Sequence, residues 1–121
     1  MYSVISDEEL DHIFSCKDEA ILTIQDEYFI DASQAALGLI GISSLKVFQS
    51  LHPARISPEF QEDGQPSILK ASEMMSLAKK NGSHTFEWTH IKLNGSPFQV
   101  RVTLRFRLEE GEFIDVHWRL L

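Results

Sequence analysis

The chain has very little cysteine: Cys16 is the only one among 121 residues. A lone cysteine excludes a disulfide framework and a cysteine-based zinc cluster, and it fits a reducing compartment. The sequence also lacks any apolar run close to the roughly 18 residues that cross a bilayer, and residues 1–10 are acidic, without the pattern of a signal peptide. We therefore expect a cytoplasmic chain, or the cytoplasmic part of a longer protein, with no direct membrane insertion.

Basic residues are scarce relative to acidic ones, with 11 Lys and Arg against 18 Asp and Glu, which gives a net charge of −7. A nucleic-acid surface needs a basic stripe, and an anionic membrane attracts basic segments, so this balance argues against both partners. Hydrophobic residues make up 43% and charged residues 24%. These values are typical of an ordinary globular chain, and the length fits one domain with its own core.

The first helix is predicted by a capping pattern in which Ser6 precedes Glu9 by three residues. An apolar stripe at helical spacing follows it, formed by Leu10, Ile13 and Phe14. Residues 1–19 therefore read as an N-terminal helical segment. The stripe either covers a core or forms a dimer interface, and amphipathic spacing does not separate the two.

The middle of the chain predicts two short strands and then helices. Apolar runs at 20–24 and 28–30 flank a turn at 25–27. Ser33 begins a helix over 34–40 that Gly41 ends. A second short helix is expected over about 44–51, an irregular loop over 52–66 with three of the four prolines, and a longer helix over 67–80 that ends at Asn81-Gly82. Its expected apolar face is Ile68, Ala71, Met75 and Ala78.

In the last third the apolar period changes from helical to two. Phe86, Trp88 and His90 begin the alternation, Asn94-Gly95 predicts a hairpin, and the alternation then continues to Leu120. Three antiparallel strands with one apolar face must bury that face against the preceding helices. The predicted fold is α+β: a five-stranded antiparallel sheet with helices packed on one face, plus an N-terminal helix.

This order of elements resembles that of PAS domains, and four stretches agree. Tyr28–Leu37 is similar to the family's second strand and first inner helix, with Ser33 where the family usually has Asn. Residues 51–67 contain SPEFQEDGQPS, which resembles an SPxFQxDGxPS run of one bacterial sensor subgroup, and Gly82–His90 continues that pattern. Val116–Arg119 looks like the end of the last strand. The resemblance covers residues 20–121.

The resemblance implies a non-catalytic module of signal transduction, as in bacterial two-component systems. Such a module binds a small ligand or a protein partner and passes a conformational or dimerisation signal to an effector. The implied partners are a second copy of the chain and a histidine kinase, diguanylate cyclase or chemoreceptor. Many family members continue into a helical linker after the last strand, whereas this sequence stops at Leu121. A piece of a longer sensor and a short protein that acts through a partner both remain open.

Candidate pocket residues are side chains, mostly apolar or aromatic, expected between the sheet and its helices. For any single one of them a plain core is the better explanation, and the sequence does not separate a filled core from a pocket. His52 could face the cavity, or bind a haem iron as in some PAS sensors, or simply cap a helix. Cys16 lacks the motif of the flavin-binding branch, and the sequence names no cofactor and no metal site. The candidates are Leu37, Phe48, His52, Phe60, Met75, Phe86, Trp88, Val102, Leu104 and Trp118.

Two other functions remain open. A cone-shaped α+β enzyme of the dehydratase or isomerase type would use a buried Asp–His pair, Asp31 with His52 or His90. A purely structural dimerisation domain would use the first helix and the outer face of the sheet. On that face Arg101, Arg105 and Arg107 are expected to be solvated.

Overall fold

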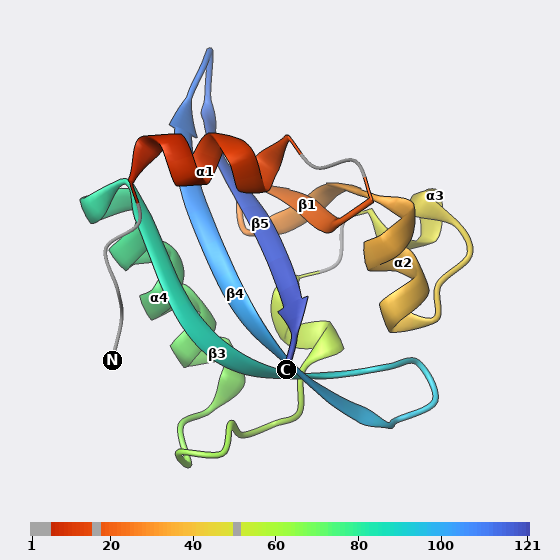
Figure 1. Cartoon of the computed structure of the whole chain (residues 1–121). Coiled ribbons are helices and arrows are strands. Elements are labelled where there is room, and N and C mark those ends of the chain that lie inside the picture. The colour runs from red at the N-terminus through yellow and green to blue at the C-terminus, as the bar shows by residue number, and fades with distance from the viewer. Residues whose placement is uncertain (1–5, 16–17, 50–51) are drawn as a thin grey trace.

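Five antiparallel strands form one sheet in the order β2-β1-β5-β4-β3 (Figure 1). The computed structural model describes residues 6–15, 18–49 and 52–121. The strands are β1 (Ala20–Gln25), β2 (Tyr28–Ala32), β3 (Ser83–Ile91), β4 (Pro97–Leu108) and β5 (Glu112–Leu120). The predicted α+β class and the five-stranded sheet are confirmed. None of the helices in the described ranges is long and apolar enough to span a membrane.

Turn chemistry fixes the hairpins. Between β1 and β2, Asp26 and Glu27 have positive φ angles of 52° and 71°, which match the twist of the flanking strands. Between β3 and β4, Gly95 takes a φ of 89°, and the side chain of Asn94 accepts a hydrogen bond from the Ser96 amide at 2.9 Å. The first strand then pairs with the last, since Ala20 lies opposite Trp118.

The inner face of the sheet is covered by elements that lie between β2 and β3 in the sequence. They are α2 (Gln34–Ile40), α3 (Leu45–Phe48), the 3-10 helix η1 (Pro53–Ile56) and α4 (Ser67–Asn81). The Ser33 hydroxyl accepts from the Ala36 amide at 3.3 Å, and Gly41 ends α2 with a φ of 89°, as the sequence predicts. Helix α3 is shorter than expected; Leu51 lies outside the described residues.

Helix α4 is rotated relative to the predicted apolar face. Its buried residues are Ser67, Ala71, Met74 and Ala78, whereas Ile68 is exposed. The buried spacings of four, three and four residues form one helical stripe, and Met75 lies at its edge, half-buried. The prediction failed at Ile68 because the first turn buries the small Ser67, whose hydroxyl accepts from the Gln61 side chain at 2.8 Å.

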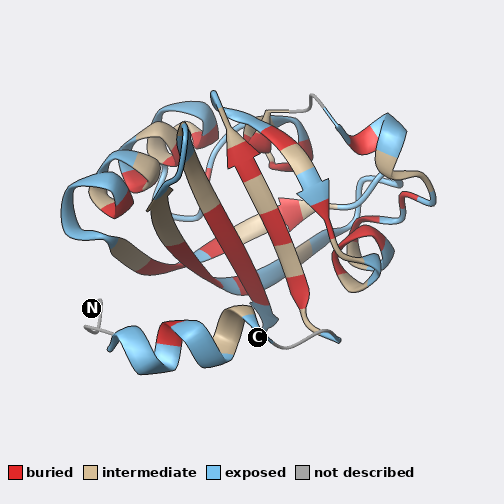
Figure 2. Cartoon of the chain, turned by 90° about the horizontal axis from the view of Figure 1, so that it is seen from above, coloured by how far each residue is buried: buried red, intermediate tan, exposed pale blue. Residues whose placement is uncertain are grey.

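Helix α1 (Asp7–Phe14) lies on the other, outer face of the sheet (Figure 2). The Ser6 hydroxyl accepts from the Glu9 amide at 3.2 Å, which confirms the predicted cap. Leu10 is buried, and Ile13 and Phe14 are half-buried. The two faces of the sheet are therefore covered in different ways: three helices and a 3-10 turn on the inside, and one short helix on the outside.

Candidate functional site

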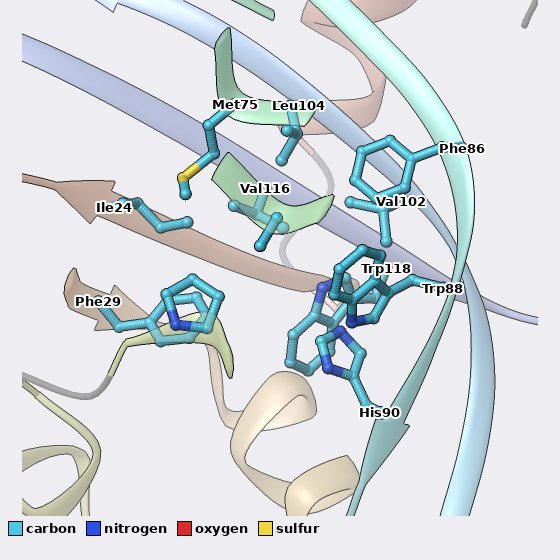
Figure 3. Close-up of a pocket in the computed structure, with 12 residues that line it drawn as sticks. Ile24, Phe29, Met75, Phe86, Trp88, His90, Val102, Leu104, Val116 and Trp118 are labelled. Atoms are coloured by element: carbon cyan, nitrogen blue, oxygen red, sulfur yellow. The ribbon is translucent and has the colours of Figure 1, made fainter. Parts of the chain in front are cut away.

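A small apolar cavity lies between the inner face of the sheet and α4 (Figure 3). Its volume is about 40 Å³, whereas sites for drug-sized ligands have about 300–1,000 Å³. In this state the cavity has room for little more than water-sized groups. It is lined by Ile24, Phe29, Pro53, Ala71, Met75, Phe86, Trp88, His90, Val102, Leu104, Val116 and Trp118.

Most of the predicted pocket residues do meet here. Those that line the cavity are Met75, Phe86, Trp88, Val102, Leu104 and Trp118. Leu37 and Phe48 are fully buried in the same core but do not line the cavity; Phe48 stacks on Phe29, with ring centroids 4.6 Å apart. The period-two alternation located the strand residues correctly, because every second side chain of a strand points to one face.

Two predicted pocket residues lie elsewhere. Nδ1 of His52 accepts a hydrogen bond from the Ala54 amide at 3.0 Å, so the ring caps η1, and it lies edge-on to Tyr28. Phe60 is 53% exposed, in a short bridge with Pro66 on the surface. Both predictions are corrected. The loop's own cap and bridge fix these side chains, and sequence periodicity carries no information about irregular segments.

Among the cavity-lining residues that the sequence did not assign to the pocket, His90 is the polar one; the others are Ile24, Phe29, Pro53, Ala71 and Val116. Its side chain is 3% exposed, and its Nδ1 lies 3.0 Å from the carbonyl oxygen of Ile56 in η1. Its ring lies 4.3 Å from that of Trp118. Burial lowers the pKa of His90 to about 3, against the opposing effect of the Ile56 carbonyl, so the imidazole is neutral at physiological pH. The sequence did contain a signal for this position: His90 lies two residues after Trp88 on β3, so both side chains point to the same face of the sheet.

Side-chain hydrogen bonds fasten the loop of residues 52–66 to β3 beside the cavity. The Trp88 indole N–H donates to the Ser57 hydroxyl at 3.0 Å. The buried Gln61 amide donates to the Thr89 carbonyl oxygen at 3.1 Å and accepts from the Thr89 amide at 2.9 Å. This pair imitates one rung of a β-ladder. These bonds hold the irregular loop, of which Pro53 lines the cavity, against β3.

The predicted Asp–His pair of an enzyme does not form among the described residues. Asp31 is exposed, and its carboxylate accepts from the Ala32 amide at 3.0 Å. The partners of the two histidines are backbone groups, the Ala54 amide for His52 and the Ile56 carbonyl for His90. These contacts give neither histidine a carboxylate that could orient it as a general base.

The outer face carries a charged cluster rather than the predicted solvated row of arginines. Asp115 of β5 is 5% exposed, and its carboxylate accepts from Arg105 at 2.7 Å and from Arg107 at 2.6 Å. Arg101 alone of the three arginines is exposed. The pairing follows from cross-strand register, in which Arg105 lies opposite Asp115, and the sequence does not reveal register.

Helix α1 is held on this cluster by a few mixed contacts. The Arg105 guanidinium lies 4.4 Å from the centre of the Phe14 ring and 3.5 Å from the Asp11 carboxylate. Nε2 of His117 lies 3.4 Å from the Glu19 carboxylate, just beyond α1. Burial lowers the pKa of His117, although Glu19 opposes that shift. Of the two alternatives for the stripe, cover of a core or a dimer interface, the structure shows it against the chain's own sheet.

Part of α1 stands off from the sheet. A polar hollow of about 510 Å³ separates them, lined among others by Glu9, Thr85, Thr103, Arg101 and Arg119. The helix is thus anchored mainly near Leu10 and Phe14, with a smaller apolar contact than α4 has on the inner face.

Comparison with known proteins finds the same arrangement in solved structures. No family model matches the sequence, and no curated protein matches it. A PAS domain from a two-component sensor histidine kinase superposes with a TM-score of 0.69 at 19% identity, over 95% of this chain and 100% of that one. A PAS domain from Colwellia psychrerythraea gives 0.68 at 14%, over 94% of each chain.

A photoreceptor shows the same likeness. The blue-light photoreceptor Vivid gives a TM-score of 0.67 at 16% identity, over 86% of this chain and 79% of that one. At identities this low, the superpositions establish the fold alone. What each of these proteins binds is not carried over to this chain. The sheet order, the inner helices between the second and third strands, and these superpositions together identify the chain as having the PAS fold.

Proposed function

We propose that the chain is a non-catalytic sensory module of signal transduction in the cytoplasm, in which occupancy of the inner cavity is transmitted to helix α1. The observation that carries the proposal is the alternation along β5. Val116 and Trp118 line the cavity, whereas Asp115 and His117 lie on the outer face, where Asp115 binds Arg105 and His117 lies edge-on to Phe14 of α1. A shift of this strand displaces both sets of side chains together, because successive residues of a strand point to opposite faces.

The inner site supports binding of a small ligand. The residues that line it are mostly apolar, and one of them is Met75, whose side chain is flexible and half-buried. Methionine adapts easily to a changed volume, since it is unbranched and has three rotatable bonds. A ligand larger than water therefore enters by moving Met75 rather than by unfolding the sheet.

The outer contacts support α1 as the responding element. The helix has eight residues, and isolated helices shorter than about 12 residues are marginal in water. Its order therefore depends on docking through Leu10, Phe14 and the Asp11–Arg105 pair. A change of about 1–3 kcal/mol in that docking is sufficient for allosteric coupling.

We place the output in an effector domain or a partner protein beyond the PAS fold itself. Release or shift of α1 would bare an apolar stripe and the charged outer face, and both are suited to contact with a second copy or an effector. A histidine kinase, a diguanylate cyclase and a chemoreceptor are the effectors that the family resemblance implies, and the two-component kinase among the solved structures supports the first of these.

Native mass spectrometry of the purified chain, with a denatured control, tests whether it carries a ligand and whether it dimerises. We expect a native mass above that of the denatured chain, and a dimer whose share rises with concentration. Mass lost on denaturation identifies the ligand. A strictly monomeric protein, with no added mass from a lysate or from a library of small molecules, would contradict the proposed function.

A further inference from the structure

The protonation of His90 follows from its one hydrogen bond. Nδ1 lies 3.0 Å from the Ile56 carbonyl oxygen, which only accepts hydrogen bonds. The neutral ring therefore carries its proton on Nδ1. The other nitrogen, Nε2, is left with a lone pair and can only accept.

That lone pair has no partner within the described part of the chain. Nε2 of His90 is buried and makes no hydrogen bond to any described group, and His90 is one of the residues that line the cavity (Figure 3). A buried acceptor without a donor is unfavourable, and such groups in native proteins call for an explanation. The position of the ring in the cavity wall supplies one.

Water explains the lone pair poorly. A buried water needs about two to four polar partners, and the cavity wall is almost entirely apolar. The indole N–H of Trp88, a nearby donor, is already bound to the Ser57 hydroxyl. A single acceptor in an apolar wall is instead complementary to a molecule with one donor group and an apolar body.

We propose that His90 Nε2 is the hydrogen-bond acceptor of the inner site, and that the site takes a small neutral aromatic molecule with one O–H or N–H group, of the phenol or indole class. This inference rests on the proposed function and specifies its ligand class. A carboxylate or phosphate is disfavoured, since its negative charge would be desolvated in the apolar cavity. A cation is disfavoured by the same desolvation.

The surroundings of His90 fit a flat ring. Trp118 lies 4.3 Å from its ring centroid, and Phe98 lies 5.5 Å away on the same part of the sheet. Aromatic pairs favour centroid distances of about 4.5–7 Å in offset or edge-on arrangements. An aromatic ligand that displaces Met75 would add to this cluster of tilted rings while its donor reaches Nε2.

The test compares phenol with toluene, which has a similar shape but no donor, by calorimetric titration of the whole chain. We expect phenol to bind about tenfold more tightly than toluene, the size expected of one buried hydrogen bond. In His90→Phe this preference should disappear while toluene still binds. His84→Phe, on the same strand but outside the cavity wall, is the matched control and should keep the preference.

A second readout does not depend on a variant that folds. In wild-type protein labelled with ¹⁵N-histidine, phenol should shift the Nε2 resonance of His90 toward that of a hydrogen-bonded acceptor, and toluene should not. Equal affinity for both molecules, with no Nε2 shift, overturns this inference but leaves a ligand sensor of another class. Binding of neither overturns the inference, and native mass spectrometry then decides separately whether the proposed function stands.

Discussion

Trp118→Ala is expected to lower the free energy of unfolding by about 3–5 kcal/mol, the usual cost of removing a buried aromatic side chain. Trp118 is 3% exposed and lies in β5, between Ala20 of β1 and Val102 of β4. Its loss enlarges the cavity and removes the ring that packs on His90. Urea unfolding followed by circular dichroism measures the change from the midpoint and slope.

Leu120→Ala is the matched control for this experiment. Leu120 lies two residues further on the same strand and on the same face, but it is 55% exposed, so its truncation should cost less than about 0.5 kcal/mol. A loss of under about 1 kcal/mol for Trp118→Ala would contradict the inner position of Trp118 and with it the register of β5.

The second large effect is a loss of stability in mild acid. The pKa of His90 is about 3 in the folded chain because of burial, whereas an unfolded histidine titrates near 6.5. Between these pH values the unfolded chain binds a proton that the folded chain does not. The free energy of unfolding therefore falls as pH falls, by up to about 1.4 kcal/mol per pH unit, or about 2 kcal/mol between pH 7 and pH 5.

Burial also lowers the pKa of His84 and His117, so their contributions have the same sign. The variant His90→Phe isolates the contribution of His90. Between pH 7 and pH 5 its free energy of unfolding should fall by about 2 kcal/mol less than that of the wild type. Urea titrations of both proteins at pH 5, 6 and 7 give this difference directly. Parallel pH profiles would show that His90 is not buried in its neutral form.

The fold could be predicted because its local chemistry agrees with its topology. Ser33 and Gly41 delimit α2, Asn94-Gly95 forms the β3–β4 turn, and the alternation from Phe86 to Trp118 gives the inner face. Each signal acts over a few residues. The apolar face of the sheet must be buried, and the helices between β2 and β3 are the elements that can cover it. These two facts leave one arrangement of the helices on the sheet.

The site could be predicted only where it rests on regular strands. His52 and Phe60 were misassigned because they lie in the irregular segment of residues 52–66, where caps and a bridge decide side-chain direction. The Asp115 cluster depends on strand register, which links residues eight and ten positions apart. The cavity itself depends on side-chain packing. Its volume is the small difference between the space enclosed by the sheet and helices and the volume of the side chains that fill this space, and no pattern of residue types encodes that difference.

The proposed function requires that the inner cavity and α1 are coupled through β5. Amide hydrogen exchange of the whole chain, with and without saturating phenol, tests it most directly. We predict slower exchange in the strands that line the cavity and also in residues 7–14 of α1, by about fivefold there for a coupling of about 1 kcal/mol. Protection of the cavity strands with unchanged exchange in residues 7–14 would contradict this coupling.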